Sequence, residues 1–121
     1  MSVTFPKGFL AAGISAGLKS SGAKDLALVV NSGPLKSAAA RFTSNRVKAA
    51  PVLWSEQVLK DGRVDAVILN SGGANACTGN EGFLDVHRTA EFVSDLLGVS
   101  ATDIAVCSTG LNGSGIATGL A

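Results

Sequence analysis

The sequence predicts an α/β fold in which a mixed sheet packs against helices. Short apolar runs of the kind that form buried strands are found at Asp25–Val30, Ala66–Leu69 and Ile104–Val106. One long segment, Glu81–Leu97, has the apolar spacing of an amphipathic helix. The order strand, glycine-rich loop, helix, strand over residues 66–106 indicates a βαβ unit, whose two strands should run parallel.

Composition restricts the function classes. With 121 residues, 46% hydrophobic and 16% charged, the chain suits one globular domain. A net charge of +1, without a dense basic cluster, argues against a nucleic-acid partner, and no apolar run is long enough to span a membrane. The 2 cysteines form no CxxC pattern and no disulfide framework, which fits a reduced compartment. Because no targeting signal is recognised, we expect a cytoplasmic location.

The N-terminal quarter predicts two strands joined by a turn. Pro6–Lys19 alternates small and apolar residues and is expected to be extended, with glycines at bulges or close contacts. Ser20–Lys24 is expected to turn. Asp25–Val30 then predicts a strand buried on both faces, and Asn31–Pro34 ends it with strong turn residues.

The next segment predicts two further strands and a short helix. Ser37–Thr43 is ambiguous because alanine favours helices, but the short flanking turns favour a strand. Ala49–Trp54 predicts a fourth strand, in which Pro51 implies an edge or a first position. Ser55 is expected to cap a short helix, Glu56–Lys60.

The best-defined helix follows the third apolar run. Ala66–Leu69 leads into a predicted loop of small and polar residues, Asn70–Gly79. Asn80 is the expected N-cap of the helix Glu81–Leu97, and Gly98 its expected end. Spacings of three and four define the apolar stripe Phe83, Val86, Ala90, Val93 and Leu97. The residues predicted for the opposite face are Asp85, Arg88, Glu91 and Asp95, with Asp85–Arg88 as an i,i+3 pair.

Two polar segments are expected at the same end of the sheet. The run Ile104–Val106 ends at Cys107–Gly110, and the βαβ order places this end beside Asn70–Gly79. Ligands of open α/β sheets bind at the carboxyl ends of the strands. The alternative is a plain strand-to-turn junction in which Gly110 supplies a positive φ.

No residue pattern identifies a reaction. His87 is expected to be a partly packed helical residue rather than a base, and Cys107 a buried small hydrophobe rather than a nucleophile. Cys77 likewise has no evident base partner. The sequence lacks metal-ligand spacing, a P-loop and a G-x-G-x-x-G motif, so neither a metal nor a bound dinucleotide is expected.

Five blocks of sequence, in order, resemble the N-terminal part of the ornithine acetyltransferase family, and most closely its actinobacterial members. These enzymes are the bifunctional glutamate N-acetyltransferases of arginine biosynthesis. The blocks are Pro6–Phe9, Asp25–Val30, Phe42–Asn45 with Ala49–Val52, Asn70–Gly79, and Cys107–Leu111. The last two are the most distinctive.

The resemblance implies an acyl-threonine mechanism. A precursor cleaves itself before a threonine, which then carries acetyl from N2-acetylornithine to glutamate, with its own amine as base. It also implies that Thr109 and Gly110 form the oxyanion hole. The expected partner is a β chain that carries the nucleophile, in an α2β2 assembly. No cofactor is expected, with acetyl-CoA open as a substrate.

The resemblance stops after Leu111. We expect residues 1–111 to form the α-chain domain and residues 112–121 to be an atypical, linker-like or altered tail containing Gly113-Ser114-Gly115. The family's nucleophilic threonine is absent, and Thr118 lacks its sequence context. We therefore expect this chain alone to be inactive. The alternatives are a catalytically inactive binding or assembly domain of the same fold, or a related threonine hydrolase.

Overall fold

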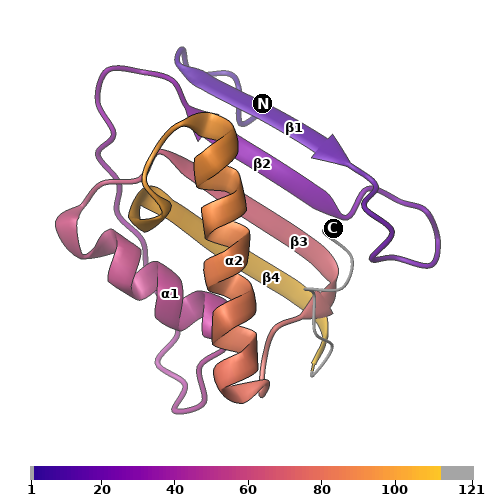
Figure 1. The fold of residues 1–121 in the computed structure, drawn as a ribbon. Coiled ribbons are helices and arrows are strands. Elements are labelled where there is room, and N and C mark those ends of the chain that lie inside the picture. The colour runs from indigo at the N-terminus through magenta and orange to yellow at the C-terminus, as the bar shows by residue number, and fades with distance from the viewer. Residues whose placement is uncertain (1, 113–121) are drawn as a thin grey trace.

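The computed structural model describes residues 2–112, which form one four-stranded mixed sheet with two α-helices (Figure 1). The elements in chain order are β1 (Phe9–Ile14), β2 (Leu26–Asn31), α1 (Ala50–Val58), β3 (Ala66–Ala74), α2 (Gly79–Leu97) and β4 (Ile104–Asn112), with short 3₁₀ turns at Leu59–Asp61 and Ala101–Asp103. The strands stand in the order β1-β2-β3-β4. The first two pairings are antiparallel and β3–β4 is parallel, which confirms the mixed sheet and the βαβ unit.

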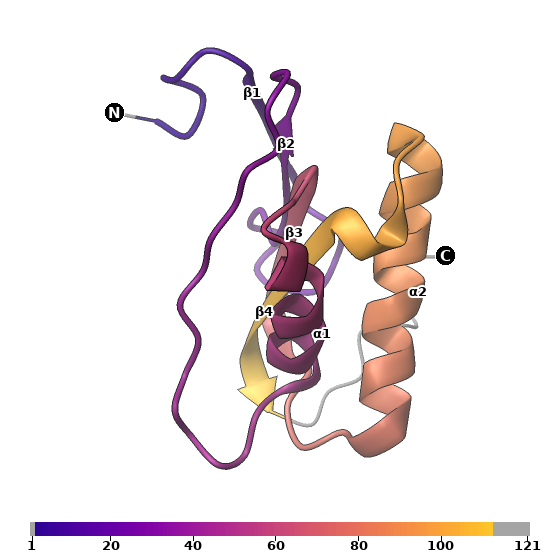
Figure 2. The ribbon, with the colours of Figure 1, turned by 90° about the vertical axis from the view of Figure 1, so that its left-hand side faces the viewer.

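The two helices cover different parts of the sheet. Helix α2 crosses one face, and α1 lies beside β4, as the two views in Figures 1 and 2 show. Within residues 2–112 no helix covers the opposite face. Among these residues, no helix has the length and apolar character needed to cross a membrane.

The core lies between α2 and the sheet. On α2, Val86, Ala90 and Val93 are at most 2% exposed, which confirms the centre of the predicted stripe. They pack with Ile68 of β3 and Ile104 of β4 in a single cluster. Burying a Val or Ile side chain stabilises the fold by roughly 1.5–3 kcal/mol, so this layer fixes the register of β3 and β4.

Two predictions about α2 are wrong in detail. Thr78 occupies the N-cap position and the helix begins at Gly79, so Asn80 is not the cap. The side chain of Asp85 is only 15% exposed because it turns toward the sheet, although it lies 3.9 Å from Arg88 as an i,i+3 pair. Gly98 ends the helix in a left-handed conformation, as predicted.

The predicted strand Ala49–Trp54 is instead the start of α1. Pro51 occupies the first turn of this helix, where the missing N–H has no intrahelical partner to lose. Ser55 is consequently a buried residue inside the helix and not a cap for the predicted helix Glu56–Lys60. Proline at a helix start and proline at a strand edge give the same local signal.

The segment Ser37–Thr43 forms no strand. It makes one isolated bridge, between Ser37 and Arg63. The four strands form the sheet without it, and its alanine-rich sequence carries no strong preference for a strand.

The predicted loop Asn70–Gly79 is strand as far as Ala74. Parallel pairing with β4 continues through Gly72↔Gly110 to Ala74↔Asn112. Residues 70–74 are therefore strand because their main chain pairs with β4, although their small and polar side chains are typical of a loop.

Candidate functional site

The carboxyl ends of β3 and β4 bring the two predicted polar segments together. Asn70 pairs with Ser108, Ser71 with Thr109, and Gly72 with Gly110. The expectation that these segments share one end of the sheet is confirmed. The sequence predicted neighbouring loops, whereas the structure places the residues in register on two paired strands.

Ser108 faces α2 and organises the chain that leads into this helix. Its hydroxyl donates to the Gly73 carbonyl at 3.0 Å and accepts the Asn75 N–H at 3.0 Å. Asn75 is 1% exposed, and its Nδ2 donates to the Gly82 carbonyl at 2.5 Å. The Thr78 hydroxyl donates to its Oδ1. These bonds tie the start of α2 to the end of β4.

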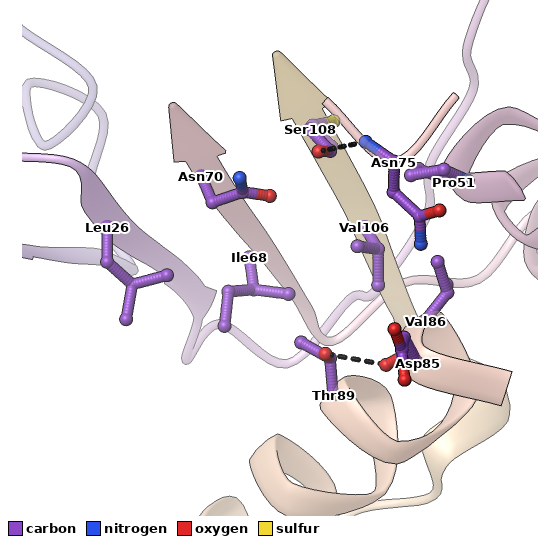
Figure 3. Close-up of a pocket in the computed structure, with 11 residues that line it drawn as sticks. Leu26, Pro51, Ile68, Asn70, Asn75, Asp85, Val86, Thr89, Val106 and Ser108 are labelled. Atoms are coloured by element: carbon purple, nitrogen blue, oxygen red, sulfur yellow. Dashed lines mark hydrogen bonds between the residues drawn. The ribbon is translucent and has the colours of Figure 1, made fainter. Parts of the chain in front are cut away.

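A small cavity lies beside Ser108, between α2 and the sheet (Figure 3). Its volume of about 20 Å³ is the size of one water molecule. Polar side chains of Asn70, Asp85 and Thr89 line it, and the Thr89 hydroxyl donates to the Asp85 carbonyl at 2.8 Å. The cavity is too small for an amino-acid substrate.

Thr109 lies on the sheet face that no described helix covers. An open groove of about 440 Å³ runs there from Gly13 of β1 through Leu69 of β3 to Thr109. Thr109 is exposed. Side chains alternate along a strand, so Ser108 and Thr109 point to opposite faces of the sheet. Ser108 points to the face covered by α2, and Thr109 points to the open face.

Gly110 is required by its surroundings. Its φ is +131°, and a Cβ built there would lie 2.6 Å from the Gly72 carbonyl carbon and 2.6 Å from the Gly73 nitrogen. The predicted positive φ is confirmed, but it occurs inside a strand rather than in a turn. The main chains of β3 and β4 therefore approach one another without intervening side chains.

Helix α1 covers the first part of the outer edge of β4. Trp54 Nε1 donates to the Ile104 carbonyl at 2.8 Å. The Ser55 hydroxyl accepts the Val106 N–H at 3.0 Å and donates to its carbonyl at 2.9 Å. Every second residue of β4 thus directs its main chain outward.

The other candidate residues lie apart from this strand pair or differ from expectation. Cys107 is exposed rather than buried as predicted, although partial burial still raises the pKa of its thiol. Cys77 is also exposed and has φ +59°. His87 packs its ring 5.2 Å from that of Trp54, which confirms a partly packed helical residue. No metal-binding group of His, Cys, Asp or Glu occurs in the part of the chain described.

Asp25 is the residue that the sequence analysis overlooked. It precedes β2 and is 3% exposed, with both carboxylate oxygens accepting main-chain N–H groups. It also borders the groove that contains Thr109. Its position directly before the apolar run Leu26–Val30 was the sequence feature that could have indicated a buried, functional carboxylate.

The fold places the chain in the class of the ornithine acetyltransferase structures. It superimposes on a crystal structure from Mycobacterium tuberculosis, described as ornithine acetyltransferase complexed with ornithine, with a TM-score of 0.91 and 57% identity over 96% of this chain and 67% of that one. A structure of the arginine biosynthesis bifunctional protein ArgJ from Bacillus halodurans gives a TM-score of 0.87 and 40% identity, over 94% of this chain and 59% of that chain.

Sequence comparison specifies the family. The ArgJ family profile matches residues 10–119, and this chain belongs to the ArgJ family. It is 72% identical to the arginine biosynthesis bifunctional protein ArgJ of Streptomyces coelicolor over 113 residues, and 62% identical to that of Mycobacterium tuberculosis over 116 residues. These matches cover 93% and 92% of this chain but only 30% and 29% of the relatives.

Proposed function

We propose that this chain is the N-terminal, α part of a glutamate N-acetyltransferase of arginine biosynthesis. In this reaction, acetyl passes from N2-acetylornithine to glutamate through an acyl-threonine intermediate. The chain spans about 30% of its bifunctional relatives. In the proposal, a β chain that completes the site carries the nucleophilic threonine. We further propose an α2β2 assembly with residues 1–111 as the α-chain domain. The predicted tail comprises residues 112–121. Residues 113–121, which include Thr118, lie outside the described residues.

Thr109 and Gly110 are proposed as the oxyanion hole. The observation that carries this assignment is their position at the end of β4, with Thr109 exposed beside the open groove and Gly110 at the strand edge. When the threonine hydroxyl attacks the acetyl carbonyl, negative charge develops on the carbonyl oxygen. The Thr109 hydroxyl and the Gly110 N–H would donate to that oxygen, while the threonine's own amine takes the hydroxyl proton.

The first test is Thr109→Ala in the complete enzyme. Loss of one oxyanion donor lowers kcat by about 10²–10³. The exposure of Thr109 predicts little effect on folding, which circular dichroism checks. Thr102→Ala is the matched control, because Thr102 is an exposed threonine in the 3₁₀ turn that precedes β4, and this variant should keep normal turnover. Full acetyl transfer by Thr109→Ala would exclude this role.

Two measurements distinguish the proposed enzyme from the alternatives, and a third tests its donor. Co-purification with a stoichiometric chain that begins with threonine supports the acetyltransferase, whereas a stable chain without a partner or acetyl transfer supports a binding or assembly domain. Hydrolysis of amides without acceptor acetylation would indicate a threonine hydrolase. Replacing N2-acetylornithine with acetyl-CoA tests whether acetyl-CoA is a second donor. No resident cofactor is part of the proposal.

A further inference from the structure

Asp25 connects three segments of the chain through its side chain and its main chain. Its Oδ1 accepts the Ala16 N–H at 2.6 Å and its Oδ2 accepts the Lys19 N–H at 2.8 Å. Both oxygens of one buried carboxylate therefore hold the connection between β1 and β2. A carboxylate is suited to this task because both of its oxygens are acceptors.

The main chain of Asp25 extends the same contact to β1 and β3. Its N–H donates to the Ile14 carbonyl at 3.0 Å, and its carbonyl accepts the Ser71 N–H at 2.8 Å. Ser71 is the residue of β3 that pairs with Thr109. Asp25 is thus one hydrogen bond away from the partner of the proposed oxyanion donor.

The segment between β1 and β2 that Asp25 holds, residues 16–19, lies against Gly72 at the site. A Cβ at Gly72 would lie 2.9 Å from the Leu18 carbonyl oxygen, and one at Gly110 would lie 2.6 Å from the Gly72 carbonyl carbon. Leu18, Gly72 and Gly110 are therefore in successive main-chain contact. Because main-chain atoms cannot change rotamer, a displacement of Leu18 is transmitted to Gly72 and from there to Gly110.

We infer that Asp25 is a positioning residue for the Thr109–Gly110 segment. Its carboxylate holds residues 16–19 against Gly72, and its main-chain carbonyl accepts the Ser71 N–H. These contacts fix the end of β3, and β3 in turn fixes the position of the paired end of β4. This inference rests on the proposed function, since it assumes that Thr109 and Gly110 are the oxyanion donors. Asp25 itself makes no contact with the reacting atoms.

The test compares two buried aspartates of the same sheet in the complete α and β enzyme. Asp25→Asn leaves one acceptor oxygen and turns an NH₂ group toward a main-chain N–H. Asp65→Asn is the matched control: Asp65 is also 3% exposed, but it lies before β3 and pairs with Arg63 at 2.9 Å. At equal folded fraction, we expect Asp25→Asn to lower kcat about tenfold or more with KM changed less than about twofold. Asp65→Asn should keep kcat within about threefold of wild type.

Hydrogen exchange supplies a readout that does not depend on activity. Asp25→Asn should accelerate amide exchange over residues 15–19, 70–73 and 107–110, whereas Asp65→Asn should leave residues 107–110 unchanged. Equal kcat values for the two variants in an active enzyme would overturn the inference. If the wild-type enzyme transfers no acetyl, the proposed function fails, and exchange over 107–110 then decides whether Asp25 positions this segment.

Asp25→Glu keeps the test decisive if Asp25→Asn does not fold. Glutamate retains two acceptor oxygens but is one methylene longer, so it should shift residues 16–19 and give a kcat below that of wild type. Faster exchange over residues 15–19 together with a wild-type kcat would contradict a positioning role.

Discussion

At the scale of single residues, the glycine pair Gly72 and Gly110 sets how closely β3 and β4 approach near their carboxyl ends. Gly110→Ala should destabilise the domain because its Cβ would lie 2.6 Å from the main chain of Gly72. Gly98→Ala is the matched control, since Gly98 also has a positive φ, +67°, but has no atom within 4 Å of the added Cβ.

The two variants differ in both backbone strain and steric contact. Alanine at the left-handed φ of Gly98 costs roughly 1–2 kcal/mol, whereas the φ of +131° at Gly110 lies outside that region and adds strain to the contact with Gly72. Gly110→Ala should lose at least about 2 kcal/mol more than Gly98→Ala in denaturant-induced unfolding, and acetyl transfer by the complete enzyme should fall with it. Equal losses would show that β3 and β4 separate easily, which contradicts a rigid site.

Polar residues and glycines of this site could be predicted only in part. The sequence placed Ser108, Thr109 and Gly110 at the end of a strand, because a short apolar run stops there. It did not predict Asp25, since its partners are main-chain N–H groups of residues 16 and 19, which carry no side-chain signal.

At the scale of elements, the contact between α1 and β4 depends on one hydroxyl. Ser55→Ala would leave the buried Val106 N–H without its acceptor, which should cost about 1–3 kcal/mol of unfolding free energy. Ser94→Ala is the control, because the Ser94 hydroxyl, also on a buried residue, donates to a carbonyl within its own helix. A loss no greater than that of Ser94→Ala would show that the Ser55 bonds contribute little.

Elements defined by strong periodicity were predicted, and elements defined by tertiary contact were not. The helix α2 and the strands β2 and β4 followed from apolar spacing. The first part of helix α1 was predicted as a strand because Pro51 and its apolar neighbours fit either element. The burial of Trp54 and Ser55 against β4 decides between them. The length of β3 depends on its pairing with β4, which a local pattern does not contain.

At the scale of the whole molecule, stability should depend on acid pH through Asp25. The N–H groups of Ala16 and then Lys19 lower the pKa of its carboxyl, with Lys19 also contributing charge. The stabilisation is therefore fully present above the pKa of an unfolded aspartate, about 4, and is lost as the pH falls through the lower folded value.

The measurement is urea unfolding of wild type and Asp25→Asn between about pH 7 and pH 2. The difference in unfolding free energy between the two should be constant above about pH 5 and narrow below about pH 4. A difference that stayed constant down to pH 2 would contradict the lowered pKa.

The order of the strands in the sheet has a consequence for biosynthesis. The spatial order of the strands, β1-β2-β3-β4, is the same as their order along the chain. A chain that leaves the ribosome N-terminus first can therefore add each new strand to the edge of the preceding one. The antiparallel strands come first, and the parallel partner of β3 arrives only after α2 has been synthesised. Among the four strands of residues 2–112, the strand that carries Thr109 and Gly110 is thus the last to join the sheet.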